Sequence, residues 1–285
     1  MKKFSFAKFS GAGNDFILFD RQKNQELQLT PELVGSLCTR RKGIGADGVL
    51  VIEDSSEYDF NMEYYNADGS KGALCGNGAR CAIKYAHFSE RLNNGKAAFS
   101  CNGKEYSGQI LKGDTVKFVL NPPNEIKTGF RIKAYEQLID ASFVDVDAPH
   151  VVININDMLE HTSDPFSGFK DLNKIPVIRI GKEIRFSDDF APNGTNVNFI
   201  KVENKKIYIR TFERGVEDET YACGTGSVSA AIIAHKNFNL KPPIEIIAKG
   251  GDKLIVNFDK VKDEIKNLSL TGPAVLTFAG EFYSI

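Results

Sequence analysis

Two similar twelve-residue segments lie about half a chain apart in this sequence of 285 residues. Cys75–Ala86 reads CGNGARCAIKYA and Cys223–Ala234 reads CGTGSVSAAIIA, so the cysteine, both glycines and two alanines coincide. Strand-rich sequence leads into each segment. Such an internal repeat predicts two related α/β halves, each with a Cys-Gly-x-Gly turn before a buried helix. Chance similarity between two Ala- and Gly-rich windows is the alternative explanation.

Short apolar or β-branched runs dominate the rest of the chain, and Gly, Asn, Asp and Pro separate them, as is typical of strands joined by turns. The expected strands are Phe16–Asp20, Val49–Ile52, Phe60–Tyr65, Thr115–Leu120, Phe143–Val146, Val151–Ile155, Asn198–Val202, Ile207–Phe212, Ile244–Ile247, Leu254–Phe258 and Ala274–Phe278. Helices are expected at Thr30–Cys38, Gly78–Phe88 and Thr225–His235. The first begins with a capping Thr followed by Pro. The other two have so little polar surface that each is expected to run through the middle of a sheet-built domain.

Chain length indicates two domains, because 285 residues is about twice a common domain size. The Pro-Pro pair at 122 and 123 lies near the middle of the chain and suits a crossover between them.

The charge balance and the apolar runs of the sequence argue against several classes of binding partner. Lys plus Arg number 36 and Asp plus Glu 37, and no run of like charge suggests a nucleic-acid or anionic-membrane partner. The N-terminus begins with basic residues but becomes polar and Gly-rich where a signal peptide needs an apolar core. No stretch approaches the roughly 20 apolar residues of a membrane span. The expectation is a cytoplasmic protein.

The five cysteines do not form a disulfide or zinc pattern. An odd number scattered over a long chain argues against a secreted disulfide framework. There is no CxxC pair, and the four histidines are not spaced with the cysteines for zinc, so no metal site is expected. The cysteines are therefore either inert core residues or reactive thiols.

A cysteine at the head of a helix has two chemical consequences. The positive end of the helix dipole favours its thiolate, because it lowers a thiol pKa from about 8.5. The unpaired N–H groups beside it can bind a carboxylate. One motif of this kind therefore supplies a base and an anion clamp.

Two such motifs facing each other would provide two thiols on either side of one bound carboxylate, which is what inversion of a stereocentre needs. One thiolate would remove the α-proton while the opposite thiol donates a proton to the other face. No metal or organic cofactor is needed. Two alternatives remain: that Cys75 and Cys223 are small buried residues at glycine-rich turns, or that they form a redox switch.

Six motifs in sequence resemble the diaminopimelate epimerase family, and they cover nearly the whole chain. In order, they are residues 8–16 (KFSGAGNDF), 41–48 (RKGIGADG), 65–70 (YNADGS) leading to 75–81 (CGNGARC), 149–150 (PH), 193–199 (NGTNVNF), and 212–215 (FERG) leading to 223–226 (CGTG).

The resemblance implies two pseudo-symmetric domains, each a curved mixed sheet wrapped around a central buried helix. The expected ranges are 1–121 plus 273–285 for the first domain and 122–272 for the second. The implied reaction interconverts LL- and meso-diaminopimelate without a cofactor, in lysine and peptidoglycan precursor synthesis. A homodimer is considered alongside a monomer.

Site residues follow from the same resemblance. Cys75 and Cys223 would be the two acid/base residues, and His150 and Glu213 would help to set their protonation. The residues expected to bind substrate are Asn14, Asn66, Gly76, Asn77, Asn196, Glu213, Arg214, Gly224 and Thr225. The asparagines could instead be turn formers, His150 a loop histidine, and Glu213 with Arg214 a solvated pair.

Four departures from the pattern bear on substrate recognition. Gly48 stands where some members have Gln, Ala148 where some have a substrate-binding Asn, and Asp147 where Gly is usual. The segment 215–220 is one residue longer than in some members.

Four rival functions are considered. A proline or hydroxyproline racemase would share the thiol pair but would not need polar residues for a distant amino-acid group. A phenazine-type isomerase would not depend on two thiols. A non-catalytic binding module or a thiol redox sensor would show no isotope exchange.

Overall fold

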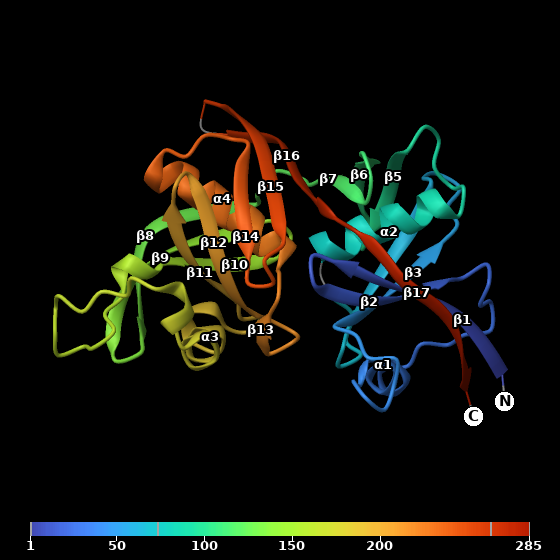
Figure 1. The fold of residues 1–285 in the computed structure, drawn as a ribbon, viewed down its shortest axis with the longest axis horizontal. Coiled ribbons are helices and arrows are strands. Elements are labelled where there is room, and N and C mark those ends of the chain that lie inside the picture. The colour runs from blue at the N-terminus through green and yellow to red at the C-terminus, as the bar shows by residue number, and fades with distance from the viewer. Residues whose placement is uncertain (1, 73, 263, 285) are drawn as a thin grey trace. The chain divides into compact units, whose positions relative to one another are not determined.

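The computed structural model describes all residues except 1, 73, 263 and 285 and divides into two compact units. Unit 1 contains residues 1–120 and 271–285, and unit 2 contains residues 121–270 (Figure 1). None of the helices in the described part of the chain has the length and apolar character needed to cross a membrane.

Unit 1 is a mixed sheet with two helices. Neighbouring strands pair in the order β17-β1-β2-β3-β4-β5-β6-β7, and only the pairs β2–β3 and β4–β5 are parallel. A parallel pair needs a long crossover connection, and the two helices occupy these crossovers. The elements are β1 (Lys2–Gly11), β2 (Asn14–Asp20), α1 (Pro31–Cys38), β3 (Gly48–Glu53), β4 (Phe60–Asn66), α2 (Gly76–Phe88), β5 (Lys96–Cys101), β6 (Lys104–Ile110), β7 (Thr115–Val119) and β17 (Val275–Ser284).

Helix α2 runs through the middle of unit 1. It contacts strands from both ends of the sheet, including β17, β1, β6 and β7, and its residues from Gly76 to Ala86 are buried. Strand β3 is covered on both faces, because Val49 and Val51 join a cluster with α1 while Leu50 lies against the start of α2. This explains why β3 reads as an unbroken apolar run.

Unit 2 repeats this plan. Its strands pair in the order β8-β9-β10-β11-β12-β14-β15, with β13 beside β12, and the pairs β10–β11 and β12–β14 are parallel. The elements are β8 (Glu125–Ala134), β9 (Gln137–Asp145), β10 (Pro149–Asn154), α3 (Val177–Arg185), β11 (Asn196–Glu203), β12 (Lys206–Glu213), β13 (Asp218–Thr220), α4 (Gly224–Phe238), β14 (Ile244–Ala248), β15 (Lys253–Val261) and β16 (Glu264–Pro273), whose last three residues are counted in unit 1.

The central helix of unit 2 is α4, which contacts β9, β10, β11, β12, β14 and β15. Helix α3 covers the outer face and packs on β11 and β12. Each unit therefore shows the same alternation: a parallel pair, an antiparallel pair, a parallel pair across the central helix, and an antiparallel pair. The α/β fold of two pseudo-symmetric halves, predicted from the repeat and the family resemblance, is confirmed.

Every predicted strand overlaps a strand of the structure, and the three predicted helices are present. Several elements were missed: strands β1, β5, β6, β8, β13 and β16, and helix α3. Strand β8 is largely exposed, with only Ile132 and Ala134 buried, so it lacks a clear apolar pattern. Helix α3 is amphipathic, but it begins after Pro176 without a side-chain cap, which removes the usual start signal.

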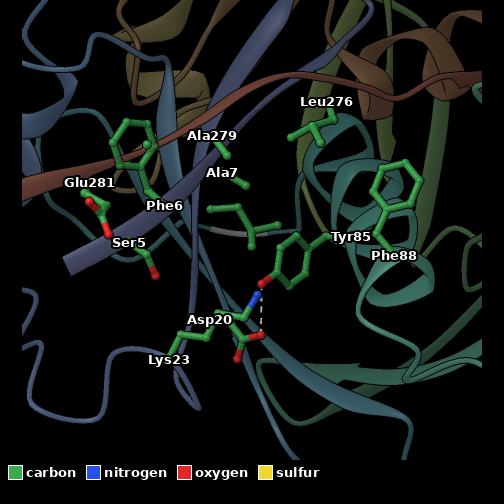
Figure 2. A pocket seen from close by; sticks show the side chains of 12 residues that line it. Ser5, Phe6, Ala7, Asp20, Lys23, Tyr85, Phe88, Leu276, Ala279 and Glu281 are labelled. Atoms are coloured by element: carbon green, nitrogen blue, oxygen red, sulfur yellow. Dashed lines mark hydrogen bonds between the residues drawn. The ribbon is translucent and has the colours of Figure 1, made fainter.

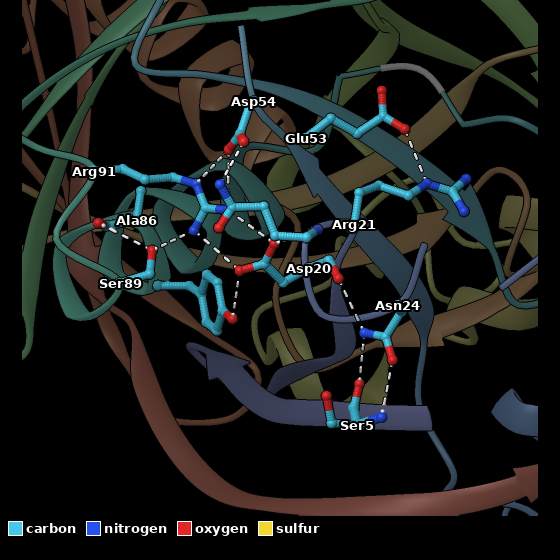
Figure 3. Close-up of polar contacts among 11 residues, drawn as sticks. Ser5, Asp20, Arg21, Asn24, Glu53, Asp54, Ala86, Ser89 and Arg91 are labelled. Carbon is cyan, nitrogen blue, oxygen red and sulfur yellow. Dashed lines mark hydrogen bonds and ion pairs between the residues drawn. The ribbon is translucent and has the colours of Figure 1, made fainter. Parts of the chain in front are cut away.

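A buried ion pair connects β2 to the loop that follows α2 (Figure 3). The carboxylate of Asp20, which is 2% exposed, accepts from Arg91 Nη2 at 2.8 Å and Nη1 at 3.0 Å, and from the Tyr85 hydroxyl at 2.9 Å. On its solvent side, Arg91 also contacts Asp54 at 3.2 Å. The pair holds the C-terminal end of the central helix against the sheet.

Removing the buried carboxylate should destabilise the protein strongly. Asp20→Ala leaves Arg91, whose side chain is only 9% exposed, without its main partner, and we expect the free energy of unfolding to fall by about 3–5 kcal/mol. Asp54→Ala removes the exposed partner of the same arginine and should cost about 0–1 kcal/mol. Urea unfolding followed by circular dichroism measures both, since the chain has no tryptophan. Equal losses in the two variants would contradict the role assigned to Asp20.

Candidate active site

Cys75 and Cys223 are the N-cap residues of the two central helices. Cys75 has φ −111° and ψ 109°, and its Sγ accepts from Gly78 N at 3.3 Å. Cys223 has φ −117° and ψ 116°, and its Sγ accepts from Gly226 N at 3.4 Å. Cys75 and Cys223 are 8% and 6% exposed as whole residues, respectively. Each sulfur thus lies at the positive end of a helix dipole, where negative charge is stabilised.

Steric crowding explains why the second glycine of each Cys-Gly-x-Gly motif has no side chain. A Cβ on Gly226 would lie 2.4 Å from Asn198 Oδ1, and one on Gly78 would lie 3.0 Å from a methyl of Leu50. In unit 2 this glycine therefore makes room for the close approach of a side chain from β11.

In unit 1, Asn14 lies beside the thiol. Its Oδ1 is 3.8 Å from Cys75 Sγ and accepts from Asn77 Nδ2 at 3.4 Å, while its own Nδ2 donates to Asp47 Oδ2 at 2.7 Å. Fully buried Arg80 donates to Asn77 Oδ1 at 2.9 Å and to Gly76 O at 3.1 Å. Three of the predicted residues, Asn14, Cys75 and Asn77, are thus brought together at the start of α2.

Behind Asn14 lies a cluster of four charged residues. Asp15 contacts Lys8 at 2.6 Å and Arg40 at 2.7 Å, and Arg40 also contacts Asp47 at 2.8 Å. Burial opposes ionisation of Asp15, but Arg40 and Lys8 outweigh it and lower its pKa. Burial and the charge of Asp15 raise the pKa of Asp47.

In unit 2, Thr225 lies between the thiol and His150. Its Oγ1 is 3.6 Å from Cys223 Sγ and 2.9 Å from His150 Nε2. The other ring nitrogen of His150, Nδ1, is 3.2 Å from Asn198 Nδ2. Asn198 also donates to Val151 O at 2.8 Å. Cys223, Thr225 and His150 thus form one connected group.

His150 is fully buried, and this determines its charge. Burial lowers its pKa from 6.5 to about 3, and the positive charge of Arg214 acts in the same direction. The imidazole is therefore neutral at neutral pH and can donate from only one nitrogen.

Three further predicted residues lie at the start of β11 and the end of β12, which adjoin in the sheet. Asn196 pairs with His150 in the sheet, donates to Pro149 O at 2.9 Å, and accepts at Oδ1 from Arg214 N at 2.9 Å. Glu213 accepts from the Thr220 hydroxyl at 2.7 Å. The Arg214 guanidinium donates to Asn193 O at 3.2 Å, and burial lowers its pKa. Both Glu213 and Arg214 are half-buried.

Asn66 differs from the other predicted residues. It ends β4, its Nδ2 donates to Ser70 Oγ at 3.0 Å, and its backbone bonds to Ser70 and Gly69 close a turn. These hydrogen bonds of Asn66 support the turn. The backbone amides of Gly76, Asn77, Gly224 and Thr225 lie in the first turns of α2 and α4, where N–H groups lack helical partners.

The sequence interpretation missed three residues that position this group: Asn198, Arg80 and Asp47. All three lie inside the six segments that resemble the family. A buried arginine in an Ala-rich helix was a detectable signal, because charged residues are rarely fully buried without partners. Asn198 and Asp47 gave no signal, since their partners are distant in the sequence.

Each unit contains a pocket lined by its own residues. One of about 510 Å³ in unit 1 is lined by Phe6, Asp20, Lys23, Tyr85 and Leu276, among others (Figure 2). One of about 520 Å³ in unit 2 is lined by residues of both charges and includes Arg214, Asn193 and Pro149. This second pocket includes the predicted site residue Arg214. Among the described residues, no group of three His, Cys, Asp or Glu is placed to hold a metal ion.

A family model described as diaminopimelate epimerase matches residues 6–127 and 143–277. A curated relative of that name from Chlorobaculum tepidum is 38% identical over 95% of this chain and 98% of its own. Another from Aquifex aeolicus is 34% identical over 96% of each chain.

The chain belongs to the diaminopimelate epimerase family.

Solved structures similar to this member of the diaminopimelate epimerase family share its fold. A Bacillus anthracis phenazine biosynthesis protein of the PhzF family has a TM-score of 0.72 at 15% identity and covers 100% of both chains. A hydroxyproline epimerase from Agrobacterium vitis has a TM-score of 0.67 at 13% identity, covering 98% of this chain and 92% of its own. At these identities the likeness concerns the fold alone.

Local geometry accounts for two of the departures from the family pattern. A Cβ on Gly48 would lie 2.6 Å from both Tyr64 Cε2 and Tyr65 O, so a glutamine does not fit here. Asp147 has φ 64°, a left-handed conformation that explains why glycine is usual at this position. Its Oδ1 accepts from Asn124 Nδ2 at 3.2 Å. Ala148 is buried, and segment 215–220 ends in β13.

The buried neutral His150 should make stability depend on pH. Its folded pKa of about 3 lies below its ordinary 6.5, so the unfolded chain binds more protons in this range and stability falls as pH falls through 6.5. Between pH 7 and pH 5, the wild type should lose about 2 kcal/mol more unfolding free energy than His150→Gln. Urea unfolding at the two pH values tests this, and identical losses would show that His150 is protonated in the folded protein.

Proposed function

We propose that this protein interconverts LL- and meso-diaminopimelate by proton transfer at one α-carbon, with Cys75 and Cys223 as the acid and base. The observation that carries the proposal is the pair of helix-capping thiols in a chain that belongs to the diaminopimelate epimerase family. The two units would be the two epimerase domains, 1–121 plus 273–285 and 122–272.

The proposed step is balanced without a cofactor. A thiolate removes the α-proton, and the electron pair of the broken C–H bond spreads into the adjacent carboxylate. The thiol of the other cysteine then gives its proton to the opposite face of the carbon. The substrate is inverted, the proton count is unchanged, and the two sulfurs have exchanged protonation states. N–H groups at the two helix starts would stabilise the carbanion.

Binding roles follow the chemistry of the substrate. The amides of Gly76, Asn77, Gly224 and Thr225 suit the reacting carboxylate, because they lie at helix starts. The far end of diaminopimelate carries an ammonium and a second carboxylate, for which Glu213 and Arg214 are complementary. Asn14, Asn66 and Asn196 would complete the polar contacts, and His150 with Glu213 would influence the thiols.

The product would serve lysine and peptidoglycan precursor synthesis. We propose that the reaction takes place in the cytoplasm. The partner is a small molecule, with no nucleic acid or membrane, and a homodimer is the assembly to test by sedimentation.

Deuterium exchange tests the substrate. The protein should incorporate solvent deuterium at the α-carbon of LL-diaminopimelate, measured by mass spectrometry, and should not do so with proline, which has no second amino-acid group for Glu213 and Arg214. Exchange with proline alone would replace this substrate by that of a proline racemase. Absence of exchange with either would favour a binding module.

Substitution of either thiol tests the mechanism. Cys75→Ser and Cys223→Ser should each lower epimerisation by at least about 10³-fold, because a serine hydroxyl is a far weaker acid than a thiol and does not ionise near neutral pH to act as the base. Elimination from a halogenated analogue, which needs only one base, should partly survive. Cys38→Ala, in the cluster beneath α1, is the matched control and should retain activity. Full activity in either serine variant would support a redox or structural role instead.

A further inference from the structure

The sulfurs of Cys75 and Cys223 have different hydrogen-bond partners. Each accepts from one helix N–H, from Gly78 in unit 1 and from Gly226 in unit 2. The second partner differs: an amide oxygen of Asn14 in unit 1, and a hydroxyl of Thr225 in unit 2. The direction of each of these bonds can be derived from the groups behind it.

In unit 1, the amide orientations are determined by groups of known polarity. The guanidinium of Arg80 can only donate, so its partner on Asn77 is the oxygen, and the Asn77 amide nitrogen faces Asn14. The Asp47 carboxylate accepts from Asn14 Nδ2. The Asn14 oxygen therefore faces Cys75, and an amide oxygen can only accept. This contact favours a sulfur that carries a proton and disfavours a thiolate.

In unit 2, the same argument gives the opposite result. The carbonyl of Val151 can only accept, so the amide nitrogen of Asn198 lies there, and its second hydrogen points to His150 Nδ1. The Thr211 hydroxyl, at 2.9 Å from Asn198 Oδ1, donates to it and supports this orientation. Because His150 is neutral, its proton is on Nε2 and is donated to Thr225 Oγ1. The Thr225 hydroxyl then has its own hydrogen for Cys223, a contact that favours a thiolate.

Charged and titratable groups also lie near the two thiols. In unit 2, His150 contacts Thr225 at the start of α4, and Glu213 and Arg214 lie at the end of β12. In unit 1, Arg80 lies on α2, while Lys8, Asp15, Arg40 and Asp47 lie behind Asn14.

We propose that in the free protein Cys223 is the thiolate and Cys75 the thiol, and that Asn198 is the positioning residue that sets this state by fixing the tautomer of His150. The inference rests on the proposed function and deepens it. The free protein is then poised to take a proton at Cys223 and to deliver one from Cys75. Thr225 links His150 to the sulfur, and Asn14 keeps the proton on Cys75.

The test measures each thiol separately and needs no substrate. Reduced full-length protein is treated with iodoacetamide between pH 5 and pH 10, and the rate at each cysteine is read by peptide mass spectrometry. Iodoacetamide reacts with thiolates, so the midpoint of each rate profile reports ionisation independently of accessibility. We expect the Cys223 midpoint to lie at least about one pH unit below that of Cys75, because the Thr225 hydroxyl donates to the sulfur of Cys223 whereas the Asn14 oxygen accepts from that of Cys75. Cys38 and Cys81 are internal controls, because burial raises the pKa of each to about 12.

Two variants separate positioning from packing. Thr225→Val keeps the shape but removes the donor, and should raise the Cys223 midpoint by about one pH unit without moving that of Cys75. Thr225→Ser restores the hydroxyl and should restore the midpoint. Nitrogen-15 NMR of the wild type should show the His150 proton on Nε2. This measurement and the wild-type profile stand even if a variant fails to fold.

The inference is overturned if the two midpoints coincide, if Cys75 ionises first, or if the His150 proton lies on Nδ1. Its failure is distinguishable from failure of the proposed function. Deuterium exchange into diaminopimelate together with coincident midpoints would reject only the assigned protonation. Separated midpoints without exchange would reject only the epimerase reaction.

Discussion

The structure depends on one constraint: a cysteine must end a strand-like segment and cap a helix that is buried on all sides. A helix through the middle of a sheet has no water to satisfy its first N–H groups, so the cap must come from the protein. Here the sulfur accepts from the amide three residues ahead in both units. The same bond that satisfies the helix start places a polarisable, ionisable atom at the positive end of the dipole, so the folding requirement and the chemical one coincide.

The strands around the central helix satisfy this constraint in the same way in both units. In each unit, the strands before and after the central helix, β4 and β5 or β12 and β14, pair in parallel. The helix is therefore their crossover connection, and its N-terminus emerges at one edge of the sheet. Loops and strand ends at that edge deliver Asn14 in unit 1 and His150 and Asn196 in unit 2. The close approach of Asn198 to Gly226 shows how little room is left, because a single methyl group there would displace the asparagine.

Symmetry of the backbone does not extend to the polar groups around the sulfurs. A reaction that uses one base and one acid needs two similar thiols in different states, and side chains can provide that difference at little cost to the fold. The x position of Cys-Gly-x-Gly is Asn77 in one copy and Thr225 in the other. Asn77 is held by Arg80, whereas Thr225 is held by His150, so the two copies place opposite hydrogen-bonding groups beside identical atoms.

The sequence by itself determined the repeat, the central helices and most strands, because these depend on local patterns: apolar runs between turn residues and a capping residue before an apolar helix. It did not reveal β8, whose exposed residues carry no apolar pattern, or α3, which lacks a side-chain cap. The resemblance to the diaminopimelate epimerase family pointed to Asn14, His150 and Thr225 as site residues. Their roles are predictions. Only the tertiary structure decided that Asn198 bonds to His150, that Arg80 orients Asn77, and that His150 is buried and neutral. These contacts join residues 3 to 48 positions apart, and hydrogen-bond direction and burial depend on which groups the fold brings together rather than on their order in the chain.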